Sequence, residues 1–160
     1  MTSNAFTIAA ADASDIGEVA ALFRAYEAHI GVDLSYQGFA DELATLPGKY
    51  AAPHGQLLIA RGANGAAIGC VALRPMEAPG CCEMKRLFVS PEGRGLGLGR
   101  ALAEAVVAEA AKLGYAELRL DTLPSMREAI AIYRKLGFAP IAPYYAAREG
   151  TLFMALSLRP

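Results

Sequence analysis

Glycines at alternate positions, in the stretch Arg94-Gly95-Leu96-Gly97-Leu98-Gly99, separate an apolar run at Leu87-Phe88-Val89 from a segment with helical periodicity that begins at Leu98. This order predicts a strand, a glycine turn and an amphipathic helix. Glycine has no Cβ, so the backbone can turn sharply and approach a ligand closely. The first N–H groups of the helix have no internal partner and carry the positive end of its dipole. The stretch therefore predicts a site for phosphate groups.

Two common phosphate-binding motifs do not fit this stretch. A dinucleotide fingerprint needs G-x-G-x-x-G, and every frame places Leu98 or Arg100 where the third glycine should stand. A Walker A loop ends in Gly-Lys-Ser/Thr, whereas this one ends in Gly99-Arg100-Ala101 and offers no hydroxyl for magnesium. The spacing that is present is R-x-x-G-x-G, formed by Arg94, Gly97 and Gly99.

A second motif follows downstream, where a predicted helix from Ala129 carries Tyr133 and a basic pair and ends at Gly137-Phe138. With both motifs in this order, about one helix and one strand apart, the chain resembles the GNAT family of N-acetyltransferases. The resemblance covers residues 83–138, and the apolar run 151–158 suits the family's last strand. It implies a mixed α/β (α+β) fold whose mostly antiparallel sheet is splayed open between its fourth and fifth strands, with helices on both faces and acetyl-CoA in the split.

Periodicity and turn signals give the same order of elements. Strands are expected at residues 6–10, 56–60, 67–73, 82–89, 116–120 and 151–158, and helices from 16 through 26, within 31–50, at 98–113 and from about 126 to 136. Asp12 or Ser14 is expected to cap the first helix, Asn64-Gly65 to supply positive φ angles in a hairpin, Gly114 to end the third helix, and Ser125 with Glu128 to form a capping box. This order predicts a mixed α/β layer, and 160 residues suit a single domain spanning residues 1–160.

Composition narrows the class of protein. The net charge of −1 gives no general attraction to nucleic acid or to an anionic membrane, and no apolar stretch approaches the ~20 residues of a membrane span. With no secretory signal at the N-terminus, a cytoplasmic protein is expected. Cys70, Cys81 and Cys82 form no CxxC pair and are expected to be free thiols in the core, and the isolated His29 and His54 indicate no metal site. The sequence leaves open whether the protein forms a homodimer.

The expected chemistry is attack of an amine on a thioester carbonyl. A lysine-like amine of pKa ~10.4 costs roughly 4.6 kcal/mol to deprotonate at pH 7, and an α-amine of pKa ~8 costs about 1.4 kcal/mol. Glu83, eleven residues before Arg94, resembles the strand glutamate that serves as base in the histone-acetylating branch of the family. The alternative is a strand glutamate paired with Lys85 on the same face, or with Arg86.

Tyr133 is the candidate acid, because the resemblance aligns it with the tyrosine that meets the coenzyme sulfur. Proton transfer from a phenol of pKa ~10 to a thiolate whose parent thiol has a pKa of ~8.5 is unfavourable by about 2 kcal/mol. Donation of a hydrogen bond is therefore expected instead of complete transfer. The alternative is that Tyr133 only fills the core stripe of its helix.

The cofactor site is expected to combine the glycine turn with the strand before it. Backbone N–H groups of Arg94, Gly95, Leu96, Gly97, Leu98 and Gly99 would hold the pyrophosphate, and Leu87, Phe88 and Val89 would offer an open strand edge to the pantetheine amides. Arg100 either adds charge or is a solvated helix residue. Family members often carry Asn where this chain has Met126, and Ser125 either substitutes for that amide or serves only as the helix cap.

The acceptor is not identified by the sequence. In the family it is held by the first two helices and by the loop before the last strand, here residues 26–50 and 142–150, and Tyr36, Phe39, Tyr144 and Tyr145 either line that pocket or pack in the core. We expect an N-acetyltransferase that acts on a primary amine of a small molecule or protein. The alternative is a catalytically silent acyl-CoA-binding or sensing module. A purely structural role would not explain why the chain carries the glycine turn.

Overall fold

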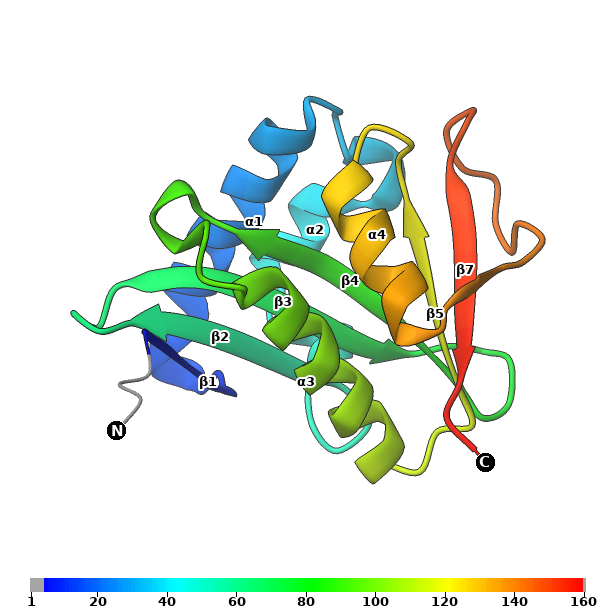
Figure 1. The fold of residues 1–160 in the computed structure, drawn as a ribbon, viewed down its shortest axis with the longest axis horizontal. Coiled ribbons are helices and arrows are strands. Elements are labelled where there is room, and N and C mark those ends of the chain that lie inside the picture. The colour runs from blue at the N-terminus through cyan, green and yellow to red at the C-terminus, as the bar shows by residue number, and fades with distance from the viewer. Residues whose placement is uncertain (1–4, 160) are drawn as a thin grey trace.

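Seven strands form one sheet in the computed structural model, which describes residues 5–159, in the order β1-β2-β3-β4-β5-β7-β6 (Figure 1). The strands are β1 (Phe6–Ala10), β2 (Gln56–Gly62), β3 (Ala67–Pro75), β4 (Cys81–Val89), β5 (Glu117–Thr122), β6 (Ala139–Pro140) and β7 (Leu152–Ser157). The helices are α1 (Ile16–Ile30), α2 (Phe39–Ala44), α3 (Leu98–Lys112) and α4 (Arg127–Leu136). Only the β4–β5 pair is parallel among the described strands, so the predicted mixed, mostly antiparallel sheet is confirmed.

Helices cover both faces of the sheet, with α3 and α4 on one face and α1 and α2 on the other (Figure 1). Strand β2 shows why, because successive side chains of a strand point to opposite faces. Leu58 and Ala60 join the core beneath α3, whereas Leu57 and Ile59 join the core beneath α1. The apolar run of β2 therefore reflects burial on two sides.

Strands β4 and β5 separate partway along their length. Their register ends with Glu83 opposite Arg119, although both strands continue beyond this pair. Farther along β4, Phe88 pairs with Cys70 and Val89 with Gly69 on β3, and no strand of residues 5–159 pairs with them on the other side. The split that the family resemblance implies between the fourth and fifth strands is therefore present, and residues 87–89 form an open strand edge.

A bulge in β4 lies next to the split. Cys70 pairs with Phe88, but Ala72 pairs with Lys85, so β4 has one more residue than β3 between these pairs. Arg86 takes the left-handed conformation with φ +62°, the only described non-glycine residue with positive φ. A bulge re-aims side chains next to it, and here two successive cations, Lys85 and Arg86, reach partners on different elements.

Several local predictions need correction. Ser125 and Glu128 form no capping box, because the N-cap of α4 is Met126 and the cap position makes no side-chain hydrogen bond. In the hairpin after β2 only Gly65 has a positive φ, and Asn64 instead accepts a hydrogen bond from the N–H of Ala66 through its side chain. Asp12 forms the capping box of a short 3-10 turn with Asp15 just before α1. The two-residue strand β6 was not predicted, since its residues are exposed and carry no alternation.

Candidate functional site

The glycine turn between β4 and α3 presents backbone donors to solvent. Gly95 and Gly97 have φ of +80° and +74°, which suits residues without a Cβ, and Gly97 is the N-cap of α3. The first bond inside the helix runs from the Ala101 N–H to the Gly97 carbonyl. Within residues 5–159 the N–H groups of residues 95–100 find no acceptor. Six consecutive free donors at a helix N-terminus are suited to bind an anion.

A cavity of about 420 Å³ lies beside this turn, and we call it the loop cavity. Its walls are the open edge of β4, the glycine turn and the start of α4. The lining residues are His29, Leu87, Phe88, Val89, Arg94, Gly99, Ser125, Met126, Arg127, Glu128, Ala129 and Ile132. Six residues predicted to bind the cofactor, including Ser125, therefore lie around one cavity with the edge of β4 exposed to it.

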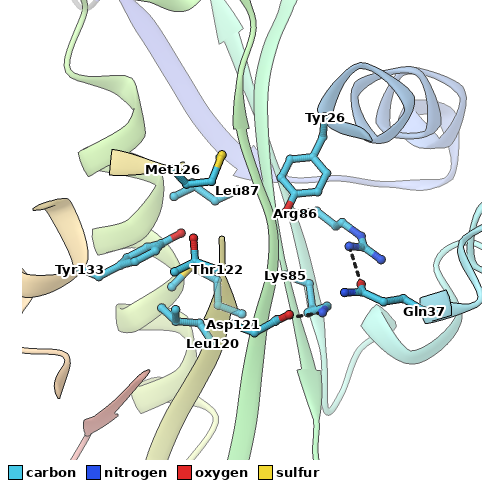
Figure 2. A pocket seen from close by; sticks show the side chains of 11 residues that line it. Tyr26, Gln37, Lys85, Arg86, Leu87, Leu120, Asp121, Thr122, Met126 and Tyr133 are labelled. Atoms are coloured by element: carbon cyan, nitrogen blue, oxygen red, sulfur yellow. Dashed lines mark hydrogen bonds and ion pairs between the residues drawn. The ribbon is translucent and has the colours of Figure 1, made fainter. Parts of the chain in front are cut away.

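A narrow space of about 30 Å³, here called the waist, lies between β4 and β5 and shares Leu87 and Met126 with the loop cavity. Figure 2 shows Tyr133 pointing from α4 into this space, with Thr122 and Met126 near it and Tyr26 on the far side. Tyr133 is 6% exposed, and burial, more than the nearby Tyr26 and Asp121, raises the pKa of its phenol. The hydroxyl is therefore protonated at neutral pH and can donate a hydrogen bond.

An ion pair crosses the waist from strand to strand. Nζ of Lys85 lies 3.1 Å from Oδ1 of Asp121, and both side chains are buried (Figure 2). Tyr145 donates a hydrogen bond to the other oxygen of Asp121. Burial acts to raise the pKa of Asp121, but the charge of Lys85 and the hydrogen bonds from Tyr145 and Lys85 outweigh it and hold the pKa below its ordinary value. Asp121 is an ionised carboxylate at neutral pH.

Glu83 lies one position before the split, with 2% of its surface exposed. Arg74 of β3 contacts Oε1 of Glu83 through Nε at 2.9 Å and Nη2 at 2.8 Å, and Tyr144 donates a hydrogen bond to Oε2 at 2.6 Å. The predicted alternative, a pairing of Glu83 with Lys85 or Arg86, is wrong: Lys85 pairs with Asp121 and Arg86 with Glu42. The bulge and the strand split direct Lys85 and Arg86 to partners other than Glu83.

On the other side of the waist lies a cavity of about 480 Å³, here called the tyrosine cavity, which shares Gln37 and Lys85 with the waist. Its lining residues are Tyr36, Gln37, Lys49, Arg74, Pro75, Met76, Glu77, Ala78, Glu83, Lys85, Arg119, Tyr144 and Tyr145. Shared lining residues thus make the three cavities neighbours along the split sheet, in the order glycine turn, Tyr133 and Glu83, and we call this series the path.

Arg86 holds Gln37, which lines both the waist and the tyrosine cavity, and it also binds α2. Its guanidinium donates to both oxygens of Glu42, at 2.9 and 2.8 Å, and to Gln37 at 2.9 Å. It also lies 5.2 Å from the ring centre of Phe39. Phe39 is a buried core residue, whereas Tyr36, Tyr144 and Tyr145 line the tyrosine cavity.

Five predicted cofactor residues are not among those that line the loop cavity: Gly95, Leu96, Gly97, Leu98 and Arg100. Arg100 points to Glu104 one turn along α3, at 2.6 Å, and both side chains are about half exposed. Leu96 is 41% exposed.

Sequence reasoning missed Lys85 and Asp121 as a pair, although charged residues interrupt the apolar residues of both strands. That interruption was the available signal. The two residues are 36 positions apart, so only the sheet topology identifies them as partners.

No helix within residues 5–159 combines the length and apolar character needed to cross a membrane. The same residues contain no cluster of three or more histidine, cysteine or acidic side chains that could hold a metal ion. All three cysteines are free and buried.

Comparisons with known proteins agree with this geometry. The model of the acetyltransferase (GNAT) family matches residues 33–138. An uncharacterized N-acetyltransferase of Schizosaccharomyces pombe is 45% identical over 131 residues, which cover 82% of this chain and 80% of that protein.

Two solved structures share the fold. An acetyltransferase of the GNAT family from Staphylococcus aureus superposes with a TM-score of 0.81 at 20% identity, over 97% of this chain and 100% of that one. The yncA protein of Salmonella typhimurium, solved with its cofactor acetyl-CoA, gives a TM-score of 0.71 at 24% identity, over 98% and 95% of the two chains.

Proposed function

Because the chain belongs to the acetyltransferase (GNAT) family, we propose that it transfers an acetyl group from acetyl-CoA to a primary amine of a small molecule or protein by direct attack. The observation that carries the proposal is the path from the loop cavity through the waist to the tyrosine cavity. Tyr133 lies in its narrowest part and Glu83 at its far side, so the two candidate groups flank one place where donor and acceptor can meet.

The residues around the loop cavity fit acetyl-CoA, which supplies an activated acyl group when bound. The free N–H groups of residues 95–100 suit the pyrophosphate, with the guanidinium of Arg94 beside them. The open edge at residues 87–89 can pair with an amide-bearing chain as a further strand would. Ser125 lines the same cavity and is not used as a helix cap, so its hydroxyl is available to the ligand.

Tyr133 acts on the leaving group in this proposal. Its phenol is held in the waist, and its raised pKa keeps the proton on oxygen, so it donates a hydrogen bond to the departing sulfur. Donation from a fixed, buried group costs little reorganisation in the transition state.

Glu83 accepts the proton of the amine. Tyr144 donates to Oε2 of Glu83, so a proton can reach the carboxylate directly or through this hydroxyl. Arg74 holds the carboxylate in place from the opposite side. Arg74 and Tyr144 fix the position of the Glu83 carboxylate, and an α-amine needs a weaker base than a lysine side chain because its deprotonation is less costly.

Direct attack is favoured over an acyl-enzyme on cysteine. Among the described residues that line the loop cavity, the waist and the tyrosine cavity there is no cysteine. Burial raises the pKa of all three thiols, that of Cys82 to about 12, and a thiol rather than a thiolate is a poor nucleophile.

One observation favours a second function, a silent acyl-CoA-binding module: both oxygens of Glu83 already accept hydrogen bonds. A screen for CoA release over amino acids, polyamines, aminoglycosides and peptide N-termini separates the two functions, with each product identified by mass. An acetylated amine supports the enzyme. Saturable coenzyme binding without any product supports the module, and no binding of CoA or acetyl-CoA at millimolar concentration contradicts both.

A further inference from the structure

A side cavity of about 240 Å³ opens next to the tyrosine cavity, and both are lined by Gln37, Lys49 and Arg74. Tyr50 lines this side cavity and is 3% exposed, and its buried hydroxyl has no hydrogen-bond partner among the described residues. A buried hydroxyl without a partner is unfavourable, so a ligand atom that reached it from this cavity would gain a hydrogen bond.

Two cations at the same boundary also have donors to spare. Arg74 uses Nε and Nη2 on one oxygen of Glu83, and its Nη1 makes no hydrogen bond or ion pair within residues 5–159. The Lys49 ammonium is likewise without a partner there. The boundary therefore presents three kinds of unused donor, from Arg74, Lys49 and Tyr50.

The carboxylates nearby do not consume these donors. Both oxygens of Glu42 accept from Arg86, and both oxygens of Glu83 are occupied. Asp41 and Glu77 line the side cavity and the tyrosine cavity respectively, but both are exposed to solvent. Their charges would repel an acceptor that carries several negative groups.

We propose that the acceptor is an amino-acid-like amine, with one carboxylate bound by Arg74, Lys49 and Tyr50 at the boundary of the side cavity. A carboxylate has only acceptor atoms, which matches a surplus of donors. Because Arg74 contacts Glu83 at 2.8 Å, a carboxylate on Arg74 and an amine beside Glu83 are only a few bonds apart. Free α- or β-amino acids and their analogues have this separation, whereas polyamines lack the carboxylate. This inference rests on the proposed function and assigns its substrate class.

The test compares matched acceptors in the CoA-release assay. Alanine, methionine, phenylalanine and glutamine are each assayed beside their own primary amide, and spermidine represents the polyamines. We expect kcat/KM to be about tenfold or more higher for the acid, the usual scale of one charge-assisted hydrogen bond. The amine of an amide is less basic and more readily deprotonated, so amine reactivity alone would favour the amide.

Variants identify the binding groups. Tyr50→Phe and Lys49→Met should each raise KM for the acid about threefold to tenfold, with kcat little changed and with the amide unaffected. Lys112→Met, which removes an exposed lysine at the end of α3, is the matched control and should change neither substrate.

The outcomes separate this inference from the proposed function. Equal or faster transfer to amides or spermidine overturns the carboxylate assignment and leaves the acetyltransferase intact. A preference for acids that both variants leave unchanged overturns the assignment to these residues. Absence of transfer to every amine overturns the proposed function and the inference together.

Discussion

Lys85 of β4 and Asp121 of β5 form a buried ion pair, 3.1 Å from Nζ to Oδ1, two residues beyond the last backbone pairing of these strands. The pair takes over the connection between the strands where the ladder of main-chain hydrogen bonds has ended. It also forms part of the wall of the waist. The split sheet is thus stabilised by a charged contact at the point where the two halves of the reaction are expected to meet.

Asp121→Asn should lower the free energy of unfolding by about 3 to 5 kcal/mol at pH 7, because Lys85 stays buried without its partner. The folded-state pKa of Asp121 is lowered, so its stabilisation is present above the ordinary carboxyl pKa of 3.8 and is lost as pH falls through the lowered value. The difference between the proteins should shrink below about pH 4. Urea unfolding from pH 3 to 7 measures it, with the exposed Asp41→Asn as control. A constant difference across this range would contradict the role of the charge.

Glu83→Gln should lower kcat/KM about tenfold to a hundredfold at pH 7, since the amide cannot take the proton of the amine. The defect should narrow as pH rises past the pKa of the acceptor amine, ~8 for an α-amine and ~10 for a lysine-like amine, because the amine then deprotonates unaided. Initial rates over this range measure the effect, with Glu77→Gln as a control at the rim of the same cavity. A defect that does not change with pH would assign Glu83 to the positioning of Arg74 and Tyr144.

Tyr133→Phe should lower kcat by roughly ten- to a thousandfold with little change in the Kd of the coenzyme, because only the donor to the departing sulfur is removed. Burial raises the pKa of Tyr133, so the ratio of the two rates should stay constant through pH 9. Tyr115→Phe is the matched control, since its hydroxyl donates to the carbonyl of His54. Full activity of Tyr133→Phe would show that another donor stabilises the thiolate.

Gly97→Val should weaken coenzyme binding more than it weakens folding. A Cβ at Gly97 would meet no protein atom within 4 Å, so the space it enters is the space where a phosphate is expected. Gly65→Val is the matched control, since Gly65 has φ +85°, the same open surroundings and a place in a hairpin outside the site. Both variants should lose similar stability from backbone strain, about 1 to 2 kcal/mol.

Calorimetry and thermal unfolding with acetyl-CoA distinguish the two glycine variants. The wild-type protein and Gly65→Val should each gain about 2.7 kcal/mol at a hundredfold excess over Kd, and Gly97→Val should gain much less. Equal stabilisation of both variants would mean that the phosphates bind elsewhere.

Local sequence patterns were enough to predict most elements of the fold and the residues of the glycine turn. Alternation, glycine spacing and helical periodicity are local properties, so they located β1, β4, α3 and α4 to within a few residues. The family resemblance added the sheet split, which the register confirms, and drew attention to Tyr133, which the structure places in the waist. The role of Tyr133 in the reaction stays a prediction.

Which charged side chains pair with one another is evident only in the folded protein. Glu83 pairs with Arg74 because strand β3 lies beside β4. Arg86 does not reach Glu83, because the bulge directs its side chain toward Glu42 of α2. Lys85 meets Asp121 because a parallel crossover brings β5 alongside β4. The free hydroxyl of Tyr50 is likewise evident only once Arg74 and Lys49 lie next to it. Such contacts join residues tens of positions apart, and a local pattern contains no information about which distant side chain will neutralise a buried charge.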